Sequence, residues 1–287
     1  MRNLSFIKMH GCGNDYIYFD CFRQPVQHPQ QLSMILSDRH KSIGGDGIVL
    51  ICPSDVADGK MRMFNIDGSE GKMCGNAIRC VGKYLYEQGY AVKDTLSIET
   101  LSGVKTLYIH AEQGNVTTVT VDMGKAIIQP AQIPVLLKGD AIINHPLTVG
   151  SQEYRITCVS MGNPHCVVFV NDTCSLPLSS IGPQFEHHSV FPEQVNTEFI
   201  RVVDAHTLDM RVWERGSGET MACGTGACAA VAAAVLNGYC AEGENVTVRL
   251  RGGELIIRYT PQRVLMTGDA EVAFTGTVTV PDKQQEP

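Results

Sequence analysis

The sequence lacks several features that mark common functional classes. It has no cluster of Lys and Arg and a formal net charge of −7, so nothing favours nucleic acid or an anionic membrane surface as a partner. No apolar run reaches the roughly 18 residues of a membrane span, and no secretory leader precedes the strand-like segment 2–8. Low-complexity sequence is scarce, and 44% hydrophobic residues indicate a globular chain. We therefore expect a cytoplasmic protein.

The cysteines lack the pattern of a disulfide framework. There are 11 of them, an odd number with irregular spacing, which is typical of thiols in a reducing compartment. The spacings Cys74-x5-Cys80 and Cys223-x4-Cys228 are not those of zinc sites, so we predict no metal. No lysine stands in a recognisable pyridoxal-phosphate setting, so we also predict no cofactor. Most cysteines should be small hydrophobic core residues.

An internal repeat organises the chain. Its 287 residues suffice for two domains of about 140 residues each. A shift of 149 residues aligns the two halves without a gap over long stretches, and the matches cluster around Cys74-Gly75 and Cys223-Gly224. We predict a first half over 1–118, a second half over 119–271, and a return of 272–287 to the first half through a strand at 274–280.

Local patterns agree between the two halves. After each Cys-Gly pair a helical segment begins, and it stops before Gly89 in one half and before Gly238 in the other. Strands are then predicted over 95–100 and 245–250. The predicted fold class is α+β, with two pseudo-symmetric domains that each wrap a β-sheet around a central helix.

A cysteine at each helix start indicates chemistry on an anion. The first N–H groups of a helix have no internal partner and, with the helix dipole, favour both a thiolate and a bound carboxylate. We expect the two helix starts to face one cleft. Inverting a stereocentre requires a base on one face and an acid on the other, and Cys74 and Cys223 would supply both. The pattern thus favours a cofactor-independent amino-acid racemase or epimerase.

Other interpretations of single residues are simpler. A cysteine before a glycine is structural in most proteins, and only the matched pair in a repeat raises the functional interpretation. Gly44-Gly45-Asp46-Gly47 lacks the lysine of a phosphate loop and is interpreted as a turn, and Asp38-Arg39-His40 as a helix end. A non-catalytic amino-acid binding protein remains an alternative, although it would need no thiol at either helix start.

Longer motifs resemble the diaminopimelate epimerase family. The resemblance covers almost the whole chain in the right order, and its motifs lie at Lys8–Tyr16, Phe64–Cys80, Met161–Cys166 and Glu214–Cys228. It implies interconversion of LL- and meso-2,6-diaminopimelate in lysine and peptidoglycan biosynthesis, the two-domain fold of that family, and a homodimer. A racemase of another amino acid on the same scaffold, such as proline or histidine, stays open.

The resemblance also assigns roles to residues. It implies that Cys74 is the proton donor and Cys223 the acceptor in the LL to meso direction, and that His165 and Glu214 tune these cysteines. Substrate contacts are implied for the side chains of Asn14, Asn65, Asn163, Asn196 and Arg215 and for the backbone at Gly75, Asn76, Gly224 and Thr225. A distal amino-acid group on the substrate would need such polar partners.

The chain departs from the family pattern in places. Gly47 follows Asp46 where many members carry a glutamine contact, so that contact is in question here. Ile66 stands where alanine is common and Ala77 where glycine is common. Neither of these two positions affects the expected chemistry.

Overall fold

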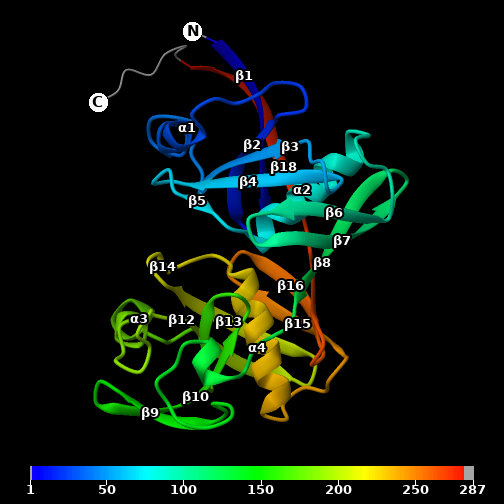
Figure 1. Cartoon of the computed structure of the whole chain (residues 1–287). Coiled ribbons are helices and arrows are strands. Elements are labelled where there is room, and N and C mark those ends of the chain that lie inside the picture. Colours follow the sequence, from blue (N-terminus) through cyan, green and yellow to red (C-terminus); the bar gives the residue numbers. More distant parts are fainter. Residues whose placement is uncertain (1, 281–287) are drawn as a thin grey trace. The chain divides into compact units, whose positions relative to one another are not determined.

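The chain forms two compact units (Figure 1). The computed structural model describes residues 2–280. The first unit holds the residues up to Val121 and those from Gly268 on, and the second unit is Asp122–Thr267. The division of the repeat after residue 118 and before residue 272 stays a prediction.

The first unit is a curved sheet around one helix. Its strands run in the order β18-β1-β2-β3-β4-β6-β7-β8, with the short β5 beside β4. Helix α2 contacts β1, β2, β4, β6 and β7, so the sheet closes around it. The elements are β1 (Arg2–Gly11), β2 (Asn14–Asp20), α1 (Pro29–Leu36), β3 (Gly47–Cys52), β4 (Gly59–Asn65), β5 (Glu70–Gly71), α2 (Gly75–Glu87), β6 (Thr95–Thr100), β7 (Gly103–Glu112), β8 (Asn115–Gly124) and β18 (Glu271–Val280).

The second unit repeats this arrangement. Its order is β9-β10-β11-β12-β13-β15-β16-β17, with β14 beside β13. The parallel pairs fall at matched places, β2 with β3 and β4 with β6 in the first unit, and β11 with β12 and β13 with β15 in the second. The elements are η1 (Pro130–Gln132), β9 (His145–Val149), β10 (Gln152–Ser160), β11 (Pro164–Phe169), α3 (Leu178–Glu186), β12 (Asn196–Asp204), β13 (Thr207–Glu214), β14 (Gly218–Glu219), α4 (Gly224–Leu236), β15 (Asn245–Leu250), β16 (Gly253–Tyr259) and β17 (Val264–Gly268).

Helix α4 lies inside its unit because its residues are small and apolar. The side chains from Ala227 to Ala234 are fully buried, and strands β10, β11, β12, β13, β15 and β16 contact the helix (Figure 1). A helix that is apolar on every side is typical of a buried position. Alanines keep the helix thin, so the sheet can close around it. The predicted α+β fold with a central helix in each unit is confirmed, as are the strands over 95–100 and 245–250.

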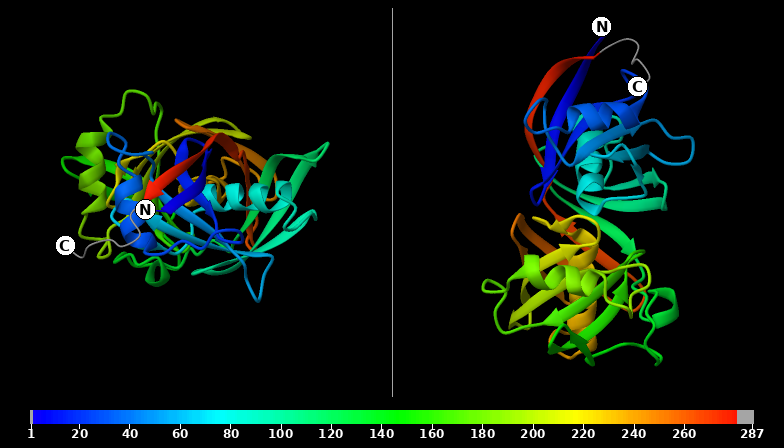
Figure 2. Two further views of the ribbon diagram at one scale, coloured as in Figure 1. Left: turned by 90° about the horizontal axis from the view of Figure 1, so that it is seen from above. Right: turned by 90° about the vertical axis from the view of Figure 1, so that its left-hand side faces the viewer.

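Strand β18 completes the first unit from the far end of the sequence. It runs antiparallel to β1, with Arg2 opposite Val280 and His10 opposite Glu271, and Figure 2 shows the two strands side by side. The fully buried Arg79 of α2 donates to the carbonyl of Asp269 at 2.9 Å, just before this strand. This contact joins the central helix to the returning segment.

Of the two outer helices, α1 was indicated only by the helix end interpreted at residues 38–40, two residues beyond its last residue, Leu36, and α3 was not predicted. Helix α1 packs on β3 and β4, and α3 packs on β12, β13 and β14. Both are short, and neither N-cap residue makes a side-chain capping bond. Within residues 2–280, no helix is long and apolar enough to cross a membrane.

Candidate active site

Each central helix begins directly after one of the two matched cysteines. Cys74 is the N-cap of α2 and Cys223 the N-cap of α4, and both have extended backbones, with φ/ψ of −133°/122° and −121°/110°. The predicted placement of both thiols at helix starts is therefore confirmed. The N–H groups of Gly75 and Asn76, and of Gly224 and Thr225, belong to the first turns, where a helix offers donors to an anion.

Asn14 connects Cys74 to the rest of the first unit. The Cys74 thiol donates to Asn14 Oδ1 at 3.3 Å, and Asn76 Nδ2 approaches the same oxygen at 3.5 Å. Asn14 Nδ2 in turn donates to Asp46 Oδ2 at 2.6 Å. Asn76 is 2% exposed, and its Oδ1 has no hydrogen-bond partner among the described residues. Asn65, at the end of β4, donates to Ser69 Oγ at 3.0 Å within its turn.

His165 is the centre of the polar group in the second unit. Its ring and the carboxylate of Glu198 are both fully buried, and His165 Nδ1 lies 2.7 Å from Glu198 Oε1. His165 Nε2 lies 3.0 Å from Asn163 Oδ1, and Asn163 Nδ2 donates to Thr225 Oγ1 at 3.4 Å. Thr225 Oγ1 is 3.5 Å from the sulfur of Cys223. The structure thus joins four of the predicted residues of this unit in one chain of contacts.

Glu214 and its neighbours form the other side of this group. Thr220 Oγ1 donates to Glu214 in a short hydrogen bond, and the Glu214 carboxylate lies close enough to the Cys223 thiol to raise the pKa of that thiol. Asn196 Oδ1 accepts from the backbone N–H of Arg215 at 3.0 Å. The guanidinium of Arg215 donates to a backbone carbonyl at Glu193, 2.8 Å away.

The Cys223 thiol has a higher pKa than the helix start alone would give it. Burial raises its pKa most, and the carboxylates of Glu214 and Glu198 raise it further, while Thr225 and the Gly226 N–H lower it. Burial also raises the pKa of Glu214. The expectation that the helix start favours a thiolate therefore needs correction at Cys223, because desolvation and two nearby carboxylates outweigh it.

Three residues of this site were missed by the sequence interpretation. Asp46, interpreted as part of a turn, holds Asn14, and Arg39, interpreted as part of a helix end, pairs with Asp46 at 2.9 Å. Glu198 lies in the buried start of β12, directly before Phe199 and Ile200. A charged residue in a buried strand is the signal that could have identified Glu198. For Asp46 and Arg39 no local pattern exists, since their partners lie elsewhere in the sequence.

The structure explains the glycine at position 47. Gly47 has φ +151°, and a Cβ there would lie 2.1 Å from the carbonyl oxygen of Phe64. No side chain fits at this distance, so the glutamine contact of other family members has no counterpart on this backbone. Gly226 is similarly constrained, because its Cβ would lie 2.6 Å from Glu198 Oε1. Among the described residues, no group of three or more His, Cys, Asp or Glu side chains is placed to hold a metal ion.

Comparisons with known proteins show the family of this chain. A hydroxyproline epimerase from Agrobacterium vitis, solved with bound trans-4-hydroxy-L-proline, shares the fold with a TM-score of 0.71 at 14% identity, over 96% of this chain and 92% of that one. A diaminopimelate epimerase of Methanococcus maripaludis is 51% identical over 279 residues, covering 96% of this chain and all of its own length. One from Acetivibrio thermocellus is 50% identical over 277 residues, covering 96% and 98%. The family described as diaminopimelate epimerase matches residues 6–129 and 157–273. The chain belongs to the diaminopimelate epimerase family and is an isomerase.

Proposed function

We propose that this protein converts LL-2,6-diaminopimelate to meso-2,6-diaminopimelate without a cofactor, as a step in lysine and peptidoglycan biosynthesis. The observation that carries the proposal is the pair of thiols, Cys74 and Cys223, at matched helix starts in a chain of this family. Each thiol has its own polar partners, Asn14 in one unit and Thr225 in the other.

The proposed reaction uses the two thiols as acid and base. In the LL to meso direction the Cys223 thiolate removes the α-proton, and the Cys74 thiol gives its proton to the opposite face of the carbanion. The Glu214 carboxylate lies near Cys223 and raises the pKa of its thiol, so we assign to Glu214 the removal of the thiol proton that forms the thiolate. Glu198 fixes His165, which holds Asn163 beside Thr225. The reverse direction exchanges the two roles.

The proposal gives the remaining polar groups to the substrate. The α-carboxylate binds the first N–H groups at Gly75, Asn76, Gly224 and Thr225, where the helix dipoles also stabilise the charge that develops during proton removal. The buried, unpartnered Oδ1 of Asn76 is an acceptor for a substrate ammonium group. Contacts to the distal amino-acid group are proposed for the side chains of Asn14, Asn65, Asn163, Asn196 and Arg215.

Proton NMR of LL-2,6-diaminopimelate in D2O with reduced protein tests the reaction. We expect loss of the α-proton signal and appearance of the meso isomer, with no exchange of proline or histidine. Exchange with one of those amino acids instead would keep the two-thiol mechanism and contradict the substrate. If no amino acid exchanges with fully reduced protein, the chain binds amino acids without catalysis.

Serine variants of the two cysteines test the division of roles. We expect Cys74→Ser and Cys223→Ser each to lower epimerisation at least about 100-fold, because an acid or base is lost. Cys74→Ser should still exchange the α-proton of the LL isomer without inversion, and Cys223→Ser that of the meso isomer. The exposed Cys174 provides the control, since Cys174→Ser should keep full activity. Unchanged turnover in either site variant would contradict the mechanism.

A homodimer and a cytoplasmic location complete the proposal. The support for the dimer within this chain is the surface of β18, where Val272 and Phe274 are 46% and 49% exposed. Exposed apolar side chains on an outer strand are typical of a protein contact. Sedimentation equilibrium of the full chain, compared with a Phe274→Lys variant, measures the association; a monomer at micromolar concentration would contradict it.

A further inference from the structure

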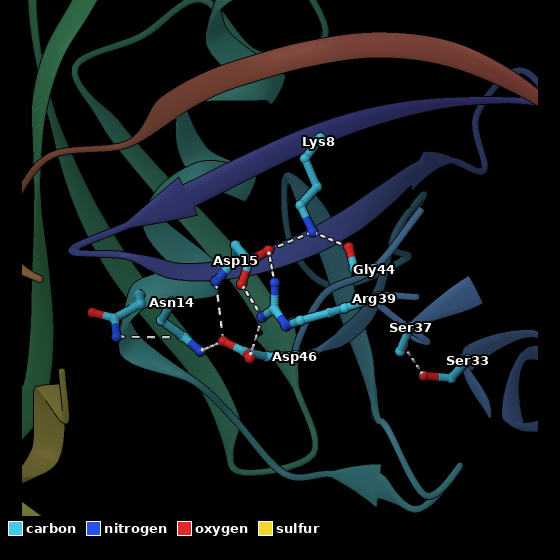
Figure 3. Close-up of polar contacts among 9 residues, drawn as sticks. Lys8, Asn14, Asp15, Ser33, Ser37, Arg39, Gly44 and Asp46 are labelled. Carbon is cyan, nitrogen blue, oxygen red and sulfur yellow. Dashed lines mark hydrogen bonds and ion pairs between the residues drawn. The ribbon is translucent and has the colours of Figure 1, made fainter. Parts of the chain in front are cut away.

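A network of four charged side chains supports Asn14 in the first unit (Figure 3). This Asp46 network consists of Lys8, Asp15, Arg39 and Asp46. Lys8 Nζ lies 2.5 Å from Asp15, and Arg39 lies 2.6 Å from Asp15 and 2.9 Å from Asp46. The side chains of Lys8 and Asp15 are only 8% and 18% exposed. Lys8 also donates to the carbonyl of Gly44, so the network fixes the turn that carries Asp46.

The network determines which way the Asn14 amide faces. Asp46 Oδ2 lies 2.6 Å from the side-chain amide of Asn14 and accepts the backbone N–H of Asp15 at 3.1 Å. A carboxylate can only accept hydrogen bonds, so the Asn14 atom that faces Asp46 must be the NH2 group. The carbonyl oxygen of the amide is therefore the atom 3.3 Å from the Cys74 sulfur. A carbonyl oxygen accepts a hydrogen bond from a thiol but has no hydrogen to donate to a thiolate.

The second unit does not repeat these four residues and holds the matched Asn163 through His165 and Glu198 instead. The positions 149 residues after Lys8, Asp15, Arg39 and Asp46 are Thr157, Pro164, His188 and Val195. Cys223 instead accepts the backbone N–H of Gly226 at 3.4 Å, a contact that suits a thiolate. The Cys74 thiol donates to Asn14, whereas the Cys223 sulfur accepts from Gly226 and lies 3.5 Å from Thr225 Oγ1, so the two halves of the repeat hold their thiols by different contacts.

We propose that Asp46 and Arg39 are positioning residues that keep the carbonyl of Asn14 toward Cys74 and thereby keep Cys74 protonated in the free enzyme. This inference rests on the proposed function, in which Cys74 is the proton donor. Two titratable groups that interact with Cys74 are Tyr18 of β2 and Cys80 of α2. Burial raises the pKa of both, so neither adds a charge beside the Cys74 thiol at neutral pH, while the buried Arg79 guanidinium donates to the carbonyl of Gly75.

Alkylation of Cys74 in an Asp46→Asn variant tests the inference. In this variant the side-chain NH2 of residue 46 must face donor groups in either orientation, those of Arg39 in one and those of Asn14 and Asp15 in the other. The Asn14 amide is therefore no longer held in one orientation. When that amide turns over, its NH2 group stabilises the thiolate. We expect iodoacetamide to react with Cys74 about tenfold faster at pH 7, which corresponds to a fall of about one unit in the thiol pKa.

The sequence allows the alkylation of Cys74 to be measured separately from that of the other cysteines. Trypsin cleaves after Lys72 and Arg79, and the peptide between them contains Cys74 as its one cysteine. Mass spectrometry of this peptide gives the alkylation rate with all other cysteines in place. The matched control is Asp58→Asn, which removes a carboxylate that pairs with Lys93 in the same unit at 2.7 Å. It should leave the rate unchanged.

The pH dependence of kcat/KM provides a second readout, which would not change if Asp46 had only a structural role. The donor must be protonated, so the alkaline limb of the kcat/KM profile should move about one pH unit lower in Asp46→Asn. If Asp46→Asn does not fold, Arg39→Gln replaces it, because the Arg39 side chain is 53% exposed. In Arg39→Gln we expect the same faster alkylation of Cys74 and the same shift of the alkaline limb, both smaller than in Asp46→Asn. Melting curves establish that each variant is folded.

The outcomes separate this inference from the proposed function. Unchanged or slower alkylation of Cys74 in folded Asp46→Asn or Arg39→Gln overturns the inference, even when the wild type epimerises its substrate. Faster alkylation in both, with the Asp58→Asn control unchanged, supports it. Absence of α-proton exchange in the wild type would overturn the proposed function, while the alkylation rates would still report the orientation of Asn14.

Discussion

At the scale of single residues, Cys223 and Glu214 show how catalytic groups can weaken a fold. Both groups lie where burial disfavours their charged forms, so the pKa of each is raised. A carboxylate beside a thiol can take its proton, which a thiol needs in order to act as a base. The carboxylate of Glu214 is kept in this position although it is costly to bury.

The first residue-scale prediction concerns Glu214→Gln. The pKa of Glu214 in the folded protein is raised above 4.5, so the unfolded chain loses this proton first as pH rises, and stability falls up to the folded-state pKa. At pH 7 the variant should therefore melt at a higher temperature than the wild type, and the difference should vanish near pH 4. Epimerisation should fall at least about 100-fold, because the group that takes the Cys223 proton is lost.

Glu219→Gln is the matched control with the opposite sign. Hydrogen bonds from Arg211, at 2.8 Å, lower the pKa of Glu219 below 4.5, so its contribution to stability is present above that value and is lost as pH falls. This variant should melt at a lower temperature at pH 7. Melting curves of both variants and the wild type from pH 4 to 8 measure the two changes in melting temperature. Changes of the same sign and size in both variants would contradict the opposite pKa shifts of Glu214 and Glu219.

The sequence could identify the cysteines but not their surroundings. Cys74 and Cys223 could be predicted because the repeat places each before a glycine at a helix start, which is a local pattern. Asp46 acts on Asn14 from 32 positions away, and Glu198 acts on His165 from 33. Such contacts depend on which strands become neighbours, as β11 and β12 do, and no periodicity records that.

At the scale of elements, the two central helices were predictable, whereas of the two outer helices only the end of α1 was indicated. Helices α2 and α4 each have 13 residues and end close to a glycine, whereas α1 has eight and α3 contains Pro183. Short helices with weak caps depend on packing for their stability. Packing also determines which residue fits at position 182, where glycine lets α3 lie directly against Trp213. At the matched position of α1, Ser33 donates a hydrogen bond to the carbonyl of Phe64.

The element-scale prediction is that Gly182→Ala separates α3 from Trp213. A Cβ at position 182 would lie 2.3 Å from the indole ring, so helix or ring must shift. We expect a loss of about 1–3 kcal/mol in the free energy of unfolding, as for an overpacked core. Trp213 is the single tryptophan of the chain, so its fluorescence reports the shift directly. Ser180→Ala, at an exposed position of the same helix, should change neither quantity; unaltered fluorescence in Gly182→Ala would contradict the packing.

At the scale of the whole molecule, the repeat is complete in its sheets but not in its connections. In the second unit β10 pairs with β9, which directly precedes it. In the first unit the strand in the corresponding place, beside β1, is β18, which arrives from the other end of the sequence. The edge of Phe274 meets the ring of Phe6, with centroids 6.0 Å apart. The first unit therefore depends on both ends of the described chain, and the second does not.

Ending the chain after Gly268 should consequently unfold the first unit selectively. The shortened chain loses β18, so β1 loses its antiparallel partner from Arg2 to His10 and Arg79 loses the carbonyl of Asp269. Hydrogen exchange followed by mass spectrometry should show fast exchange in β1 and α2 and retained protection in α4, since elements with few remaining contacts open first. A chain ended after Val280 keeps β18 and should exchange like the full protein. If α4 loses protection together with α2, the two units unfold as one and the separation into independent halves is wrong.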